Sequence, residues 1–290
     1  MLSSSALDEA FERMASAGFE LPNGFVNHGA MACEALAALG FESELGAWAR
    51  RFSSIAGAPV RPKATKTFDW RPALGDYNQL SEWIGHFEEQ VADEGWAAVT
   101  ETWVPRLMPA LSTVLFHGAI RTAHAVRAVA AADTEPRRAE LARALGYWAA
   151  RYRPGEPAIP AESEHTRAYV LTSAAEAARY YLASPSIYFL HGVTGAMAVE
   201  ILLDHLPWRG REEAIAQVRA ELSAMHDGAR PAAALNVAGA LENELAEAAE
   251  TSGDPHEVKL VEACRRGWSA TGNEVFVAAA EMVTGRARPQ

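Results

Sequence analysis

Three histidines are each followed by glycine at the start of an apolar, alanine-rich stretch: His28-Gly29, His117-Gly118 and His191-Gly192. Neutral imidazole is the commonest metal ligand and titrates near physiological pH, so three such contexts predict a metal or acid/base site. The alternative for any one of them is a structural histidine that is buried and hydrogen-bonded to a backbone carbonyl. The recurrence favours the functional interpretation. The glycine after each histidine indicates that another group comes close there.

His124 lies seven residues after His117, so on a straight α-helix the two share a face but stand about 10.5 Å apart along the axis. This separation is awkward for one metal ion, and both residues bind it only if the rings stretch along the axis or the helix is distorted. Otherwise one of them supports the site indirectly. Arg121 lies between them. It either binds a substrate oxygen as a catalytic residue or forms a salt bridge with Glu34 or Glu200.

Lys259 is a further candidate, because it precedes two apolar residues near the start of a predicted helix. A buried lysine must either lose its proton or be modified, and reaction with CO2 converts the amine into a carbamate, a carboxylate-like oxygen ligand. The alternatives are a solvated surface lysine and a site that uses His256, on the same side of the helix, in its place. The four remaining histidines are predicted to lie on the surface: His86, His165, His205 and His226.

Apolar residues recur at three- and four-residue spacing almost throughout, and alanine and leucine are abundant, so the chain is predicted to be all-α. We expect a compact multi-helix bundle of about ten helices in a single domain over residues 1–290. A proline-containing connection over 58–75 is of the kind that often covers a site. His28 falls in a helix that ends at Gly40, and His117 and His124 fall in a long apolar segment that ends near residue 132.

Proline and glycine separate the later predicted helices, which cover about 135–152, 163–183, 186–205, 210–226, 236–251, 255–268 and 271–284. Residues 25–36 and 188–202 show a short similarity. This similarity suggests two pseudo-repeated halves, with His28 and His191 at related depths around a central metal site.

Apolar residues make up 49% of the chain and charged residues 22%, which is ordinary globular composition. The formal charge of -11 disfavours nucleic acid and anionic membrane surfaces as partners. Two cysteines form neither a disulfide framework nor a thiolate zinc site. No signal peptide and no apolar stretch of about 20 residues is recognised. These features predict a soluble, cytoplasmic protein.

Familiar catalytic motifs are missing from the sequence, including the Gly-x-Ser-x-Gly elbow, the Gly-x-Gly-x-x-Gly loop, the phosphate-binding loop and His-Glu-x-x-His. Without strands there is no Rossmann domain, so a requirement for NADPH has no binding motif to support it. The eight tryptophans either line a cavity for a flat aromatic ligand or belong to the core.

The order of these motifs resembles that of the questin oxidase-like family. The similarity is carried by Phe25-x-Asn27-His28-Gly29-x-Met31-x-x-Glu34, Leu115-Phe116-His117-Gly118-x-Ile120-Arg121-Thr122-x-His124, His191-Gly192-Val193-Thr194 and His256-x-x-Lys259. The first two motifs are the more specific, and together the four span nearly the whole chain. The chain is shorter than the fungal members of that family, so its substrate-pocket loops are expected to differ.

The resemblance implies a helical oxygenase that opens a ring of a polycyclic aromatic polyketide, such as an anthraquinone, with O2 as co-substrate. It also implies a non-haem Fe(II) held by His28, His117, His124, His191 and a carboxylated Lys259. A different class remains open, a non-catalytic carrier for a hydrophobic aromatic ligand in which the histidines are structural. A third is a haem or other cofactor enzyme with one axial histidine.

Overall fold

The computed structural model describes residues 5–63, 68–155, 158, 167–233, 237 and 242–286. Within these residues the secondary structure is helical, apart from one isolated bridge between Glu20 and Val26. The prediction of an all-α bundle is confirmed. The described residues form fourteen α-helices instead of about ten, and one of the additional helices is a single turn within the connection over 58–75.

The helices are α1 (Ala6–Ala15), α2 (Gly29–Leu39), α3 (Leu45–Ser54), α4 (Trp70–Ala73), α5 (Leu80–Glu94), α6 (Trp96–Leu107), α7 (His117–Ala131), α8 (Glu135–Ala150), α9 (Arg167–Ala183), α10 (Ile187–Leu202), α11 (Trp208–Met225), α12 (Glu242–Ser252), α13 (Pro255–Thr271) and α14 (Glu274–Val283). Short 3-10 turns also occur, among them η4 (Leu203–His205), which follows α10 directly.

Local chemistry explains where many of these helices begin and end. Side chains accept a hydrogen bond from a backbone N–H of the first turn at five helix starts, namely at Ser5, Asp69, Ser186, Asp254 and Asn273. Glycines in the left-handed conformation follow α2 and α13, at Gly40 and Gly272. Helix α6 contains Pro105 and continues to Leu107 before the chain turns toward α7.

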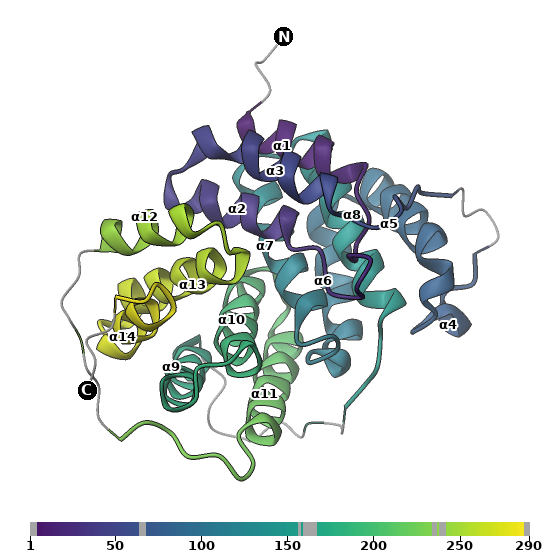
Figure 1. Ribbon diagram of the computed structural model, residues 1–290. Coiled ribbons are helices and arrows are strands. Elements are labelled where there is room, and N and C mark those ends of the chain that lie inside the picture. Colours follow the sequence, from purple (N-terminus) through teal and green to yellow (C-terminus); the bar gives the residue numbers. More distant parts are fainter. Residues whose placement is uncertain are drawn as a thin grey trace.

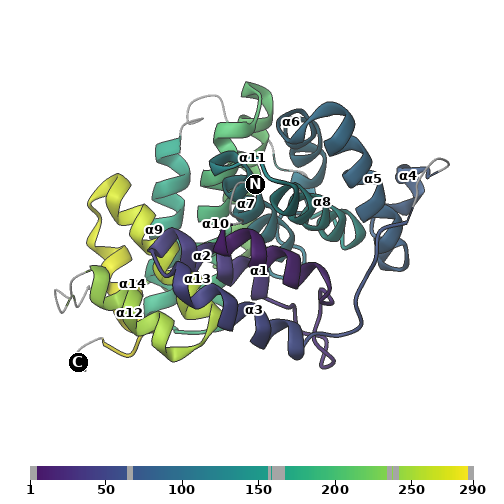
Figure 2. The same ribbon diagram turned by 90° about the horizontal axis from the view of Figure 1, so that it is seen from above.

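Helices α2, α7 and α10, which carry His28, His117 and His191, lie toward the middle of the bundle (Figure 1). In this view α1 and α3 lie at the top and α9 and α11 at the bottom, while α12 to α14 lie on one side and α4 to α6 on the other. Helix α7 packs against α2, α8 and α10, and α13 packs against α2, α10 and α14. The view from above also shows α13 next to α2 (Figure 2). Segments from both ends of the chain therefore meet at the centre.

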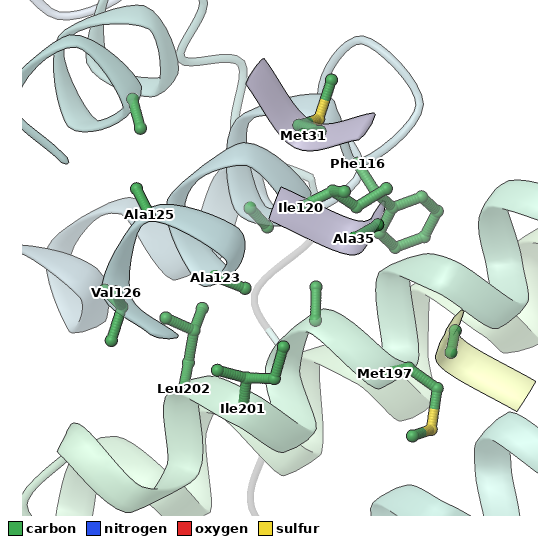
Figure 3. Close-up of a cluster of buried hydrophobic side chains, with 14 of the residues drawn as sticks. Met31, Ala35, Phe116, Ile120, Ala123, Ala125, Val126, Met197, Ile201 and Leu202 are labelled. Carbon is green, nitrogen blue, oxygen red and sulfur yellow. The ribbon is translucent and has the colours of Figure 1, made fainter. Parts of the chain in front are cut away.

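A buried apolar layer joins α2, α7 and α10. Met31 and Ala35 from α2 lie near Phe116 and Ile120 at the start of α7, with Met197 from α10 nearby (Figure 3). A Cβ atom on Gly195 would lie 2.6 Å from Cδ1 of Phe116, so glycine lets the phenyl ring rest directly on the backbone of α10. This close packing fixes the start of α7 relative to α10.

Residues Ile187–His205, which comprise α10 and η4, form one helix that is long and apolar enough to cross a membrane by length and composition. However, 78% of its apolar window is buried inside the protein. A helix that is apolar on all sides is expected at the centre of a large bundle, and α10 has this position. Its hydropathy is therefore explained by burial within the protein.

Candidate metal centre

Four histidines from four helices meet at the centre of the bundle. His28 is the N-cap of α2, His117 is the first residue of α7, His191 is the fifth residue of α10, and His256 is the second residue of α13. Nε2 of His117 lies 2.6 Å from Nε2 of His28 and 3.2 Å from Nε2 of His191. The ring of His256 is centred 4.4 Å from that of His28 and 5.5 Å from that of His191. The N-terminal ends of four helices therefore converge on one cluster.

Hydrogen bonds at Nδ1 orient three of the four rings. Nδ1 of His117 lies 2.5 Å from the carbonyl oxygen of Val114, and Nδ1 of His191 lies 2.6 Å from that of Ile187. Nδ1 of His256 lies 3.0 Å from a carboxylate oxygen of Asp254. Each of these oxygens accepts only, so each Nδ1 carries a proton, and in the neutral rings of His117 and His191 Nε2 carries the lone pair. Metal-binding histidines are oriented by hydrogen bonds of this kind.

The facing Nε2 atoms of His117 and His191 indicate a cation site between them. Both are acceptors by the argument above, and two lone pairs at 3.2 Å repel each other unless a proton or a metal ion intervenes. Burial, followed by the charge of Lys259, lowers the pKa of His28 and His117 well below the usual value and that of His191 to about 3, which disfavours a proton. A metal ion removes the conflict.

The spacing of the donors fits one ion. Two nitrogens that each lie about 2.1 Å from a metal at right angles are about 3 Å apart. The separations around His117 are close to this value. One ligand atom from each of His28, His191 and His256 also lies within 4.8 Å of the others. The donor set therefore fits a metal bound mainly by imidazole.

Lys259 lies on the same side of α13 as His256 and is 1% exposed. Its Nζ atom has no hydrogen-bond partner among the residues that the structure describes. Burial lowers the pKa of this amine to about 7. The alternative of a solvated surface lysine is wrong, and the charge on this amine is felt by three of the four histidines.

His124 does not join the cluster. It lies two turns further along α7, where Nδ1 contacts a carboxylate oxygen of Glu34 at 2.6 Å. The helix stays regular between residues 117 and 131, so nothing shortens the separation of about 10.5 Å that a straight helix imposes on His117 and His124. The fourth imidazole of the cluster is therefore His256 and not His124, and the sequence offered His256 only as an alternative to Lys259.

Arg121 forms the salt bridge that its position suggested, but with a different carboxylate. Its Nε and Nη2 atoms donate to the two oxygens of Glu140 on α8, at 2.7 and 3.0 Å, and not to Glu34 or Glu200. The guanidinium also lies over the ring of Phe19, 4.4 Å from its centroid. The donor edge and one face of the guanidinium are thus engaged within the core. This placement gives no support to a catalytic role for Arg121.

A partly buried chain of ion pairs joins the four helices that carry the histidines. Arg127 of α7 binds Glu34 of α2 and Glu262 of α13, and Arg266 of α13 binds both Glu262 and Glu200 of α10. Burial alone would raise the pKa of Glu262, but the two arginines outweigh it and lower that pKa. The chain of charges therefore fixes the relative positions of the four helices whose N-terminal ends carry the four histidines.

The backbone before His117 is unusual. Val114, Leu115 and Phe116 have φ angles of 50°, 51° and 64°, in the left-handed region that β-branched and bulky residues rarely adopt. Each such residue costs about 1–3 kcal/mol and persists only where its surroundings hold it. Burial of the Phe116 ring against Gly195 and the hydrogen bond from His117 to Val114 both stabilise this turn. No sequence signal predicts it.

The glycines that follow the histidines serve packing. A Cβ atom on Gly29 would lie 2.5 Å from Met14, on Gly118 2.6 Å from Trp148, and on Gly192 2.8 Å from Met225. The expectation that another group comes close is confirmed. In each case the close group is a side chain of a neighbouring helix.

The remaining sequence candidates lie away from the cluster. His86, His205 and His226 are half-buried among aromatic rings and not on the open surface, and His226 stacks on Tyr180 with centroids 3.7 Å apart. His165 lies outside the described residues. Three of the tryptophans are fully buried in the core, namely Trp83, Trp103 and Trp148. The core interpretation of these tryptophans is therefore confirmed.

The two short segments that suggested a repeat do bring their histidines together, since the rings of His28 and His191 are centred 6.5 Å apart. The histidines nevertheless occupy different helix positions, an N-cap in one case and the fifth residue in the other. Comparison of the chain with protein-family models, with curated proteins and with solved structures found no significant match. The resemblance to the questin oxidase-like family stays a prediction that rests on the sequence motifs.

Proposed function

We propose that His28, His117, His191 and His256 bind Fe(II), and that the protein is a non-haem iron oxygenase that acts on a flat aromatic molecule. The observation that carries the metal site is the pair of acceptor Nε2 atoms of His117 and His191, which face each other at 3.2 Å. The oxygenase class, and an anthraquinone-type polyketide as substrate, are what the motif resemblance implies.

Iron is compatible with a site rich in imidazole, although zinc, copper and nickel share that preference. Bound Fe(II) would supply the one-electron chemistry with O2 that amino-acid side chains cannot perform. The protein contributes a dry, rigid cage. His28, His117 and His191 are buried, and hydrogen bonds from Nδ1 of His117 and His191 hold their Nε2 atoms toward the centre. Asp254 orients His256 in the same way.

Lys259 is proposed to provide an anionic ligand as its carbamate. The neutral amine adds to the carbon of CO2, so that an N–C bond forms, one proton leaves to water, and a carboxylate-like group remains. Burial without a partner favours the neutral amine that this step needs. An anion is favourable there because the N-terminal ends of α2, α7, α10 and α13 point their positive dipole ends at the cluster.

Metal content tests the proposal directly. Protein purified without chelators, or loaded anaerobically with Fe(II), should contain near-stoichiometric iron by elemental analysis. His117→Ala and His191→Ala should lose it while the far-UV circular dichroism stays helical. His226→Ala, which removes a half-buried histidine elsewhere, is the matched control and should retain iron. The proposal would be refuted if the wild-type protein bound no transition metal under these conditions.

A second candidate, a carrier for an aromatic ligand, is favoured by one observation. A pocket of about 510 Å³ opens beside Val114, whose carbonyl is bonded to His117, and its largely polar lining includes the ring of Tyr77 and the guanidinium of Arg151. Such a pocket can serve binding without chemistry. Oxygen uptake by the iron-loaded protein with 1,8-dihydroxyanthraquinone separates the two functions. An oxygenase consumes O2 in proportion to the quinone, whereas a carrier gives only a spectral shift.

A further inference from the structure

The turn before His117 has a backbone conformation that no other non-glycine residue adopts in the described part of the chain. Val114, Leu115 and Phe116 are the three residues other than glycine with positive φ angles there. None of them belongs to the types that tolerate this conformation, which are glycine, asparagine and aspartate. Such strain persists only where surrounding contacts maintain it, and it is concentrated at binding sites and at segments that switch conformation. Its position directly before a cluster histidine indicates a functional role.

The other three histidines are held by unstrained segments. The Asn27 side chain fixes the chain at His28 through three hydrogen bonds to backbone groups. His191 lies within the regular helix α10, and the Asp254 side chain accepts from both the backbone and the ring of His256. His117 alone follows residues in the left-handed conformation. If one ligand moves away from the cluster, the backbone therefore favours His117.

Few hydrogen bonds hold this turn in place. The N–H groups of Val114 and Leu115 have no acceptor among the residues that the structure describes. Those of Phe116 and His117 donate at 3.3 Å, which is long for a backbone hydrogen bond. The main remaining contacts are the Phe116 ring on the backbone of α10 and the His117 ring on the carbonyl of Val114. The turn is therefore weakly held compared with the helices around it.

In the metal-free cluster, the neighbouring imidazoles repel His117. Its Nε2 atom lies 2.6 Å from that of His28 and 3.2 Å from that of His191. A proton on His28 relieves the first contact, but the lone pairs of His117 and His191 still face each other. A bound metal ion turns this repulsion into attraction. The observed position of His117 is therefore favoured with metal and disfavoured without it.

The space for an outward movement of the turn is present. Val114 is 37% exposed, and Ser112, Thr113 and Val114 border the pocket of about 510 Å³. Movement into this pocket would let Val114 return to an ordinary φ angle. Because the carbonyl of Val114 is bonded to Nδ1 of His117, the imidazole ring would follow the turn away from the cluster.

We infer that residues 112–116 form a gate for the metal ion, which opens in the metal-free protein by moving His117 toward the pocket and closes when the ion is bound. The inference rests on the metal site of the proposed function, but it requires neither iron nor oxygenase chemistry. Opening releases the strain of three left-handed residues, whereas the bond between the ion and His117 favours closing. The gate explains how an ion reaches a cluster in which three of the four histidines are buried.

The rate of metal uptake tests the gate. Val114→Gly removes the cost of the left-handed conformation at an exposed position, so the closed form should become more stable and the open form rarer. Metal-free protein is mixed with Co(II) in a stopped-flow instrument, and the visible absorption of the bound ion is followed. Uptake by Val114→Gly should be about three- to tenfold slower than by the wild type, and the final affinity should be unchanged or higher.

Val114→Ala is the matched control. It removes the same exposed methyl groups as Val114→Gly but keeps the Cβ atom, and with it the cost of a positive φ angle. Its uptake rate should therefore lie closer to that of the wild type than to that of Val114→Gly. An equally slow Val114→Ala would mean that the lost side chain, and not the relief of strain, determines the rate, which would contradict the gate.

Hydrogen exchange gives a readout that does not depend on uptake. The N–H groups of Phe116, His117 and Ile120 make backbone hydrogen bonds within the turn and to it. Mass spectrometry of peptides that cover residues 111–120 should show faster exchange in the metal-free wild type than after addition of Co(II). Peptides from α10 should exchange slowly in both states. In Val114→Gly, the segment 111–120 should exchange more slowly than in the wild type even without metal.

The outcomes separate the gate from the proposed function. Equal uptake rates in the wild type and Val114→Gly, or equal exchange of residues 111–120 with and without Co(II), would overturn the gate and leave the metal site in place. Gated uptake of Co(II) by a protein that consumes no O2 when loaded with Fe(II) would keep the gate and remove the oxygenase. A protein that takes up neither ion would remove the metal site and the gate together.

Discussion

One carboxylate oxygen of Asp254 accepts both the backbone N–H and the ring Nδ1 of His256, at 2.8 and 3.0 Å. The same atom therefore caps α13 and orients the most accessible imidazole of the cluster. The stability of α13 and the orientation of the His256 ring therefore both depend on the Asp254 side chain. A substitution that keeps the cap but removes the charge separates these two roles.

Asp254→Asn should weaken metal binding without weakening the fold. Asparagine caps helices about as well as aspartate, so the free energy of unfolding should stay within about 0.5 kcal/mol. Loss of the charge beside His256 should reduce metal affinity by about tenfold. Competition with a chromophoric chelator measures the affinity. Asp69→Asn, which changes the cap of α4 away from the cluster, should have no effect on it.

Lys259→Met should stabilise the metal-free protein and abolish iron binding. Methionine has a similar length and no amine to bury without a partner, so unfolding in urea should become harder by about 1–4 kcal/mol at pH 7. The folded-state pKa of about 7 is lower than the unfolded value of 10.5, so the wild-type protein should gain stability as pH rises from 7 toward 10.5. The variant should lack this gain.

The carbamate can be observed separately from activity. Protein supplied with 13C-bicarbonate should show a carbamate carbon signal by NMR that is missing in Lys259→Met. Iron affinity should fall in CO2-free buffer and recover when bicarbonate returns. Full affinity without CO2 would contradict carboxylation and leave the four histidines as the ligand set.

Glu262 should make the fold sensitive to acid. Arg127 and Arg266 lower its folded-state pKa below the unfolded value of 4.5, so its contribution to stability is present above pH 4.5 and is lost as pH falls through the folded pKa. In the metal-free protein, the free energy of unfolding in urea should decrease below pH 4.5. Glu262→Gln should be less stable at neutral pH but show a shallower decrease, and an identical slope in both proteins would refute this role.

Gly118→Ala should destabilise the protein by about 1–3 kcal/mol, because the added Cβ would lie 2.6 Å from the Trp148 side chain. Gly46→Ala is the matched control. Its nearest neighbour would be the flexible end of Arg50 at 3.4 Å, so higher helix propensity should stabilise the protein by about 0.5–1 kcal/mol. Thermal unfolding of both variants measures the difference.

The sequence predicted the parts of this site that depend on local patterns. The apolar periodicity identified the helices, and the repeated His-Gly context selected His28, His117 and His191, which the fold brings together. The choice between His124 and His256 required tertiary structure, since it depends on how α13 lies against α2. The spacing of His117 and His124 already argued against their sharing an ion, because a regular helix cannot shorten that separation.

Other contacts had no signal in the sequence. Arg121 pairs with Glu140 because α7 packs against α8, and no local pattern distinguishes that carboxylate from Glu34 or Glu200. The left-handed turn at Val114 to Phe116 is unfavourable for those residue types, so propensity argues against it. The packing of the Phe116 ring stabilises this turn, and such packing between distant residues cannot be recognised from the order of residues in the sequence.

The meeting of α2 with α13 has a consequence for biosynthesis. His28 lies near one end of the chain and His256 near the other, so a nascent chain that has reached α10 presents only three of the four imidazoles. Contacts between distant parts of a chain form late, because loop closure must precede them. Under the proposed function, the complete ligand set would therefore form only after α13 has packed against α2, and protein without the metal would lack one of the links between these two helices.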